Sequence, residues 1–232
     1  MKNLLYVTLV FSLFFVSCNS DESSSFCQND RVELQFSIPD YTKGGVISTA
    51  ATIPGTEDEN IVQKLYLFFF SSSKPLLKYE IENEFFDGGT WNSKDKKVSL
   101  NLSVFDVGER DVYIVANYSD LLKPQLNGVA TKDDFVGIFE KMDEPWSPGM
   151  AAPILMVGNK THNFILNKTL QFVELQRAVA KLKLNITLPA VHQSLPFVNN
   201  IAQYQYRYID FDQKTYVEKP TQKEDDLTTS AW

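Results

Sequence analysis

Cysteine and histidine are scarce in this sequence, with two of each among 232 residues. Two cysteines cannot form a disulfide framework, and the histidines His162 and His192 leave little room for imidazole metal sites or acid–base pairs. Basic residues are also outnumbered, with 22 Lys and Arg against 29 Asp and Glu, and the net charge of −7 has the wrong sign for attraction to phosphate backbones. We therefore expect no nucleic acid partner and no metal site.

The motifs of the common enzyme classes are missing as well. The chain contains no G-x-S-x-G elbow, no H-E-x-x-H zinc site, no Walker loop and no G-x-G-x-x-G fingerprint. Asp210 and Asp212 share one face of a predicted strand, as calcium ligands or glycosidase carboxylates would, but two residues are too few for either site. The sequence predicts no catalytic residue, no cofactor and no enzyme activity.

Apolar residues, by contrast, are plentiful. Hydrophobic residues make up 44% of the chain and charged residues only 22%, which is the balance of a packed globular body and not of a disordered chain. With roughly 150 residues per domain as a guide, this length allows one large domain or two small ones.

The N-terminus has the anatomy of an export signal. Lys2 is followed by an apolar run over residues 4–16, then by Ser17 and Cys18. A membrane-spanning helix needs roughly 20 apolar residues, so this shorter run predicts a signal peptide over residues 1–17. The sequence Phe-Val-Ser-Cys at 15–18 resembles the lipobox of bacterial lipoproteins, which implies that Cys18 is acylated, for example with palmitate. The alternative is an ordinary secretory signal that contains a cysteine.

Residues 18–30 form a short polar and acidic segment, which we interpret as a flexible tether. Its Ser, Asp and Glu residues are similar to the segments that direct Bacteroidetes lipoproteins to the outer face of the outer membrane. The mature chain carries a net charge of −8, because Lys2 is the only charge removed with the signal. Cys27 is expected to remain unpaired and without chemistry.

The body of the chain has the periodicity of β-strands. Alternation or short apolar runs predict strands at 32–38, 61–70, 76–81, 98–104, 111–116, 154–157, 170–175 and 178–188, and helical spacing predicts a helix at 133–142. The run at 61–70 is expected to be a central strand buried on both faces at its end. Many short strands separated by turns favour a mostly β protein with one or two small helices, as a sandwich or an open barrel.

Several of these stretches together resemble one family. The lipobox, the alternating strand 32–38, and the sequences IVQKLYLF at 61–68, DVYIVAN at 111–117 and ELQRAVAKL at 174–182 are similar to the N-terminal domain of Bacteroidetes fimbrillins. The resemblance implies a transthyretin-like β-sandwich of Greek-key type over residues 31–190. Residues 191–232 would then begin a second β domain that is truncated.

The resemblance also implies a function as a subunit of type V surface fimbriae. Such subunits are exported as lipoproteins, and they assemble when a neighbouring subunit's strand fills a groove opened by removal of the first strand. In this chain the first strand would be 32–38, with Leu34, Phe36 and Ile38 as its plug residues. The implied partners are other fimbrial subunits, outer-membrane lipid through Cys18, and a ligand on a host or bacterial surface.

Proteolytic processing is the point at which the chain departs from the family. Polymerising subunits are commonly cut at an arginine in the loop after the first strand, but residues 41–60 contain no arginine and offer Lys43 instead. Arg31 precedes the strand, so a cut there would remove the lipid and leave the groove filled. Two versions follow, a shaft subunit cut near Lys43 and an uncleaved, lipid-held anchor or accessory subunit, and we favour the second.

A second class of function shares the anchor and the β architecture. A surface glycan-binding lipoprotein would bind polysaccharide through exposed aromatic side chains, for which Trp91 and Trp146 are the candidates. Tight polysaccharide binding would identify this class, whereas a first strand that exchanges between subunits would identify the fimbrial class.

Overall fold

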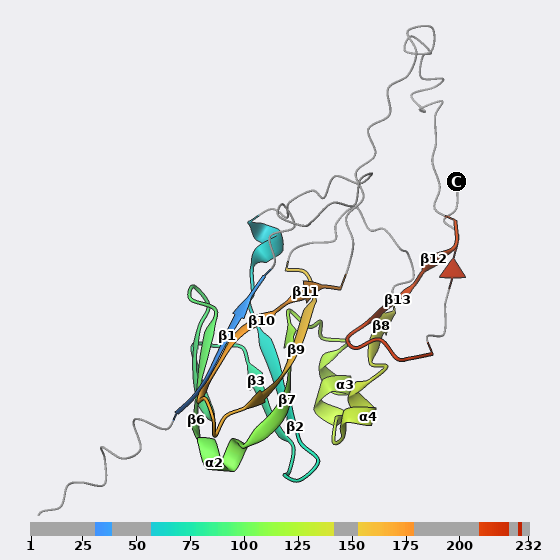
Figure 1. The fold of residues 1–232 in the computed structure, drawn as a ribbon. Coiled ribbons are helices and arrows are strands. Elements are labelled where there is room, and N and C mark those ends of the chain that lie inside the picture. The colour runs from blue at the N-terminus through green and yellow to red at the C-terminus, as the bar shows by residue number, and fades with distance from the viewer. Residues whose placement is uncertain (1–30, 39–56, 142–152, 179–208, 223–226, 229–232) are drawn as a thin grey trace, which may run out of the picture.

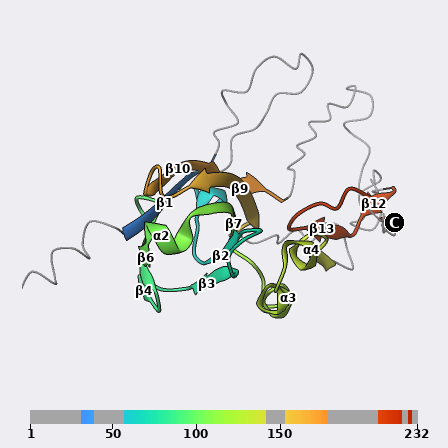
Figure 2. The same ribbon diagram turned by 60° about the horizontal axis from the view of Figure 1, so that its bottom comes forward.

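Two five-stranded sheets pack face to face in the computed structural model, which describes residues 31–38, 57–141, 153–178, 209–222 and 227–228. The apolar side chains between the sheets come from both of them and form one continuous core. Figure 2 shows the two layers from a second direction. The predicted mostly β sandwich is therefore confirmed.

The first sheet holds the strand nearest the N-terminus in an interior position. Its spatial order is β10 (Thr169–Glu174), β1 (Arg31–Ser37), β6 (Lys97–Ser103), β5 (Gly89–Asn92) and β4 (Phe85–Phe86). β1 is parallel to β10 and antiparallel to β6. The sequence predicted β1, β6 and β10, but it gave no sign of β4 and β5.

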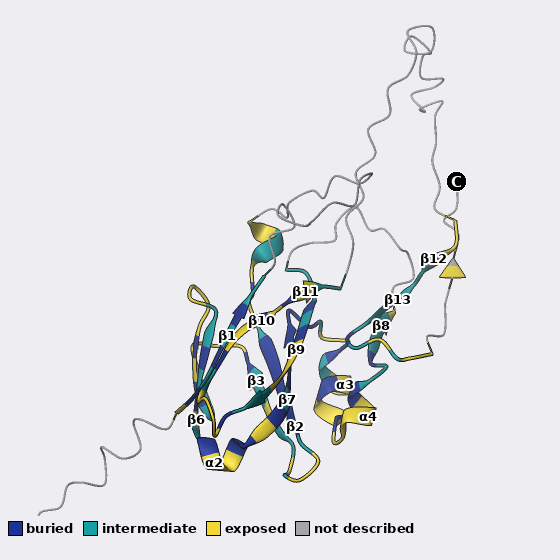
Figure 3. Cartoon of the chain, in the orientation of Figure 1, coloured by how far each residue is buried: buried dark blue, intermediate teal, exposed yellow. Residues whose placement is uncertain are grey.

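The second sheet contains the most apolar strand of the molecule. Its spatial order is β11 (Gln176–Arg177), β9 (Met156–Asn163), β7 (Glu109–Ala116), β2 (Leu65–Phe70) and β3 (Leu77–Ile81). All six residues of β2 are buried (Figure 3), which confirms burial on both faces. β3 returns antiparallel to β2, as the sequence predicted.

A third layer covers the face of the second sheet that points away from the first sheet (Figures 1 and 2). It consists of helices α3 (Lys123–Gly128) and α4 (Lys132–Phe135) and of the strand pair β8 (Phe139–Lys141) and β13 (Lys214–Tyr216). Aromatic residues of β2 and β7 pack under this layer and make a second apolar cluster. We call it the outer cluster; it is built around Tyr66, Phe68, Phe70, Tyr113 and Phe135.

Four further short elements complete the described residues. They are a 3-10 turn at Asp58–Asn60, helix α2 (Val104–Val107) at the end of β6, and the pair β12 (Phe211–Asp212) and β14 (Leu227–Thr228). Ser103 caps α2 by accepting a hydrogen bond from the Phe105 amide. Gly108, with φ of 68°, ends the helix in a backbone conformation that favours glycine.

The helix predicted at 133–142 is wrong in its extent. The helix ends at Phe135, Val136 is extended, Gly137 has φ of 91°, and a strand begins at Phe139. The helical spacing of the apolar residues arises because Phe135 and Ile138 both reach the outer cluster from either side of this turn. The N-terminus of α4 fits the sequence, because Thr131 and Asp134 form a capping box.

Two buried polar residues hold the strands of the second sheet to their connections. Arg110 is 2% exposed, and its guanidinium donates to the carbonyls of Val107, Phe69 and Pro75 at 2.7, 3.2 and 2.7 Å. Burial lowers the pKa of Arg110, yet these carbonyls and that of Asp106 at 3.5 Å accept hydrogen bonds from the cation without a carboxylate. Asn117, with φ of 59°, similarly ties the end of β7 to the segments before β2 and β9.

Candidate functional site

The position of β1 in the first sheet is the candidate functional site, and we call it the β1 slot. On one side Glu33 and Leu34 pair with Thr169 and Leu170 of β10, and on the other side the same two residues pair with Ser99 and Val98 of β6. Backbone hydrogen bonds outside the regular ladder extend the pairing of β1 at both of its ends, for example from the Glu33 amide to the Lys168 carbonyl at 3.1 Å. Strand β1 is therefore paired along both edges.

The inward face of β1 fills the sandwich core. Val32 and Leu34 are fully buried and Phe36 is 3% exposed, whereas Glu33 and Gln35 lie half-buried on the other face. The ring of Phe36 stacks on Trp91 of β5, with 5.4 Å between ring centroids and 14° between planes. Core side chains therefore pack against Val32, Leu34 and Phe36, which have the spacing expected for one face of a strand.

The structure places the predicted plug residues unequally. Leu34 and Phe36 occupy the core as expected, but Ile38 is only partly buried and packs against its margin. Val32 is also fully buried on this face and was not in the predicted set, although its place in the alternation could have identified it.

Strand β10 contributes an irregular edge to the slot. Between Leu34 and Phe36 the β1 strand advances two residues while β10 advances three, from Leu170 to Val173. The extra residue is accommodated at Phe172, which has φ of 58° and is 65% exposed. A β-bulge of this kind bends the strand and disrupts the ladder locally. The pairing with β6 also has one irregularity, between Arg31 and Val32, and it is regular from Val32 to Gln35.

One ion pair crosses the solvent face of the slot. The Lys97 ammonium on β6 lies 2.8 Å from the Glu33 carboxylate on β1, and both side chains are partly exposed. Such exposed pairs contribute about 0–1 kcal/mol, so β1 is held mainly by its backbone ladders and its buried face.

The remaining predicted residues separate into two groups. Arg31 is exposed at the first position of β1, where it pairs with Ser103, so its side chain is open to solvent. Cys18 and Lys43 lie outside the described residues, as do His192 and Trp146. Their predicted roles stay predictions.

Trp91 does not have the exposure that glycan binding requires. It is 5% exposed, and its ring belongs to the sandwich core beside Phe36. Its position on β5 brings it under β1, a contact that the sequence could not show because β5 itself was not predicted. The expectation of an exposed Trp91 platform is therefore wrong.

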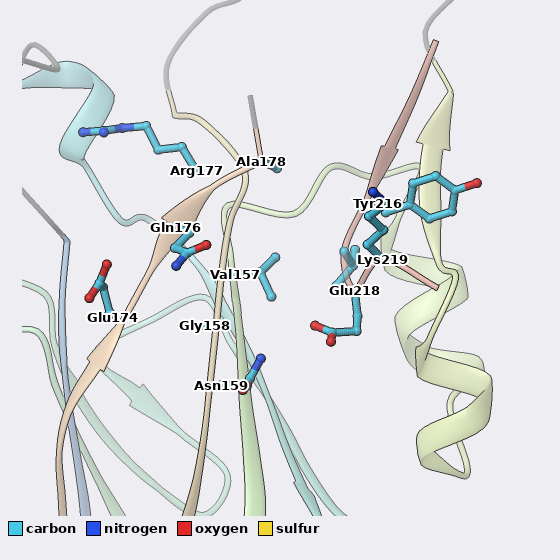
Figure 4. A pocket seen from close by; sticks show the side chains of 11 residues that line it. Val157, Gly158, Asn159, Glu174, Gln176, Arg177, Ala178, Tyr216, Glu218 and Lys219 are labelled. Atoms are coloured by element: carbon cyan, nitrogen blue, oxygen red, sulfur yellow. The ribbon is translucent and has the colours of Figure 1, made fainter. Parts of the chain in front are cut away.

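A cavity of about 440 Å³ lies between β9, β11 and residues 216–219. In Figure 4 the side chains of Arg177 and Tyr216 point away from this gap, while Asn159 and Glu218 lie beside it. Within the described residues no group of three or more His, Cys, Asp or Glu side chains could hold a metal ion. No helix in those same ranges is long and apolar enough to span a membrane.

Comparison with known proteins identifies relatives of this chain. Residues 42–184 match the family described as major fimbrial subunit protein (FimA), and residues 178–232 match the family described as minor fimbrium tip subunit MfA4, C-terminal. The minor fimbrium tip subunit MfA4 of Porphyromonas gingivalis is 38% identical over 99% of this chain and 70% of its own length.

Two solved structures also resemble the chain. A cell adhesion protein, so described provisionally, from Bacteroides eggerthii has 17% identity and a TM-score of 0.42, over 64% of this chain and 40% of its own. A protein of the same description from Parabacteroides distasonis has 16% identity and a TM-score of 0.36, over 61% of this chain and 32% of its own. The chain thus spans less than half the length of either.

The relatives that match by sequence are structural subunits of fimbriae, not enzymes. The match to the fimbrial subunit family covers more than half of the chain, and the match to the tip subunit covers nearly all of it. The chain therefore belongs to the Bacteroidetes fimbrillins, and it is a structural subunit of a cell-surface fimbrium.

Proposed function

We propose that this subunit is exported as a lipoprotein acylated at Cys18, that it is an accessory subunit supporting adhesion, and that subunits join at the β1 slot when a neighbour's strand displaces β1 from it. The observation that carries the proposal is the position of β1. The first strand after the tether lies inside a sheet, with Val32, Leu34 and Phe36 in the core. A strand in that position can be replaced by another chain's strand without any change in the rest of the topology.

The pairing of β10 explains why the slot would need an occupant. β10 is at the edge of its sheet, and β1 is its neighbour there. Without β1, the backbone groups of β10 and β6 that face the slot would lose their partners, and the core side chains of Leu100 and Leu170 would be uncovered. Unpaired edges beside an apolar floor favour capture of an extended strand.

The occupant of the slot must satisfy both edges. A strand that repeats the present pairing would run parallel to β10 and antiparallel to β6, with apolar side chains at alternate positions. The bulge at Phe172 adds a constraint, because two residues of the incoming strand must span three of β10 at that point.

We favour an accessory role over a shaft role for two reasons. Residues 41–60 contain no arginine, so release of β1 would need a cut at Lys43, whereas a cut at the exposed Arg31 would leave β1 in place. The relative that matches 99% of the chain is described as a minor fimbrium tip subunit, not as a major subunit. In this proposal the first domain spans residues 31–190 and a second β unit begins at 191, from which β13 and Val217 pack back on the first domain. The two family matches, which meet near residue 180, support a division of the chain in this region.

Intact-mass measurement of the protein isolated from outer membranes tests lipidation and processing together. We expect a chain that starts at acylated Cys18, and Cys18→Ala to release it from the membrane while the control Cys27→Ala does not. A chain that starts after Lys43 would overturn the accessory role. An unmodified start within residues 18–30 would overturn lipid anchoring.

A strand-replacement assay tests the β1 slot itself. A specific protease site inserted in residues 41–56 would allow β1 to be cut from the folded protein and competed by a labelled peptide of residues 31–38. We expect the native peptide to bind, a peptide with Leu34→Asp and Phe36→Asp to fail, and a matched peptide with Glu33→Gln and Gln35→Glu to bind as well as the native one. Equal binding of all three would overturn exchange at this slot.

A further inference from the structure

Exposed apolar side chains gather at one end of the sandwich. Phe105 on α2 is 66% exposed, and Ile165 and Leu166 in the turn between β9 and β10 are 52% and 84% exposed. We call these three residues the apolar tip. The turn lies against α2, because the Phe164 amide donates to the Gly108 carbonyl at 3.0 Å.

The chain enters the sandwich at this same end. Arg31, the first residue of β1, pairs with Ser103, which caps α2. The Lys168 carbonyl just after the turn accepts a hydrogen bond from Glu33. Figure 1 shows α2 and the start of β1 together at the lower end of the molecule.

The turn that carries two of the tip residues is ordered by its own side chains. The Asn163 carboxamide oxygen accepts from the amides of Ile165 and Leu166 at 3.1 and 3.3 Å. The Asn167 carboxamide in turn accepts from the Thr169 amide at 3.0 Å. Hydrogen bonds of this type fix the backbone locally, so the turn presents its two apolar side chains without further ordering.

We propose that, before the subunit joins a fimbrium, the apolar tip rests on the lipid surface to which the chain is attached, an inference that depends on the proposed acylation of Cys18. Thirteen residue steps separate Cys18 from Arg31, a span of at most about 45 Å when fully extended. The tip is therefore within reach of the anchor's own membrane. Arg31 and Lys168 are exposed near it, where long basic side chains can reach lipid phosphates while their stems lie along the apolar boundary.

A lipid surface fits the tip better than a protein partner does. A stable protein interface buries about 800 Å² on each partner with matched shape, which is far more than three side chains at the end of a sandwich provide. Insertion into a lipid boundary needs no matched shape, and its strength scales with the apolar area that becomes buried.

The test separates contact by the tip from native acylation. The chain from residue 19 onward, with a polyhistidine tag in place of Cys18 and with Cys27→Ser, is held on phosphatidylcholine vesicles that contain a nickel-chelating lipid. A polarity-sensitive fluorophore is placed at Leu166→Cys or, as the control, at Phe85→Cys, a site of similar exposure on β4.

We expect the emission of the fluorophore at Leu166→Cys to shift to the blue on vesicles. Its quenching by aqueous iodide should fall roughly two- to threefold, as for a probe about 5–10 Å into the interface. The Phe85 fluorophore should not change. Equal accessibility of both sites would overturn the tip contact even if mass measurement shows acylated Cys18. Protection of the Leu166 site in assembled fimbriae but not on vesicles would overturn it in favour of a subunit contact.

A second measurement does not depend on the label. A variant with Phe105→Ser, Ile165→Ser and Leu166→Ser, tagged in the same way, should leave the vesicles at least about tenfold faster during imidazole competition, because the buried apolar area is lost. Phe85→Ser is the matched control and should leave at the unmodified rate. Thermal unfolding of both variants checks that the fold is intact, and equal release rates would overturn the proposal.

Discussion

Strands β1 and β2 both lie inside a sheet and both place apolar side chains in the sandwich core, but they are held in different ways. β2 is buried on its two faces, one in the sandwich core and one in the outer cluster, while β1 is buried on one face only. β2 also pairs in regular register with β3 and β7, whereas β1 pairs on one side with the bulged strand β10. The difference makes β2 the fixed spine of the domain and agrees with the proposal that β1 is the strand that is exchanged.

Truncation in β2 is expected to have the largest effect. Phe68 is fully buried and contacts Phe135 and Tyr66, with ring centroids at 5.0 and 4.7 Å. Phe68→Ala should lower the free energy of unfolding by about 3–5 kcal/mol, measured by urea denaturation, because it leaves a cavity in the outer cluster. Phe85→Ala, at a 74% exposed site, should change it by about 0.5 kcal/mol or less.

Truncation in β1 should be costly for stability and should also loosen the strand. Leu34→Ala removes a fully buried plug and is expected to lower the free energy of unfolding by about 2–5 kcal/mol. Unlike Phe68→Ala, it should speed hydrogen exchange in β10 more than in β7, because β10 depends on β1 for its pairing. Equal acceleration in both strands would remove the distinction between the exchangeable strand and the spine.

Loss of the α4 cap tests the layer that makes β2 different from β1. Thr131 accepts a hydrogen bond from the Asp134 amide and forms the capping box of the helix that carries Phe135. Thr131→Ala should lower the free energy of unfolding by about 0.5–2 kcal/mol. Thr131→Ser keeps the hydroxyl and should restore most of that loss, so an equal loss in both variants would argue against the cap.

The smallest expected effect depends on pH. Asp111 on β7 accepts from Lys132 of α4 at 2.8 Å and from Thr161, and these hydrogen bonds lower the pKa of its carboxyl. A lowered folded pKa means that the stabilisation is present above the unfolded pKa of about 3.9 and is lost as the pH falls through the folded value.

We therefore expect Asp111→Asn to reduce the free energy of unfolding by at most about 1 kcal/mol at pH 7, because the pair is partly exposed. The difference from the unmodified protein should shrink as the pH falls below about 4. Urea unfolding at several pH values measures it, with Glu84→Gln as an exposed control. A difference that grows toward acid pH would contradict the assignment.

Periodicity was enough to predict β1 and β2 and to distinguish them. Alternation at 32–38 indicated one buried face, and the continuous run ending at Phe70 indicated two. The third layer could not be predicted, because Phe135, Ile138 and Val217 reach the outer cluster from elements that are too short to show a period.

Pairing over long distances was also beyond the sequence. The parallel neighbour of β1 comes more than 130 residues later, and no local signal indicates which of several apolar strands will lie beside it. Trp91 is an example of a residue whose environment depends on such long-range pairing. Its aromatic side chain suggested a binding surface, but the fold places it in the core under Phe36, on a strand whose GTWN sequence has no clear alternation of apolar residues.

The short ladder between β8 and β13 has a mechanical consequence. β13 is paired with β8, the Val217 amide donates to the Ile138 carbonyl at 2.8 Å, and the Val217 side chain lies in the outer cluster. A pull applied to the chain beyond Lys219 therefore meets this ladder before it reaches the residues that lead back to β11. Tension would enter the domain at the third layer, which packs on the second sheet over β2, and strand β1 in the other sheet would not be the first part to carry the load.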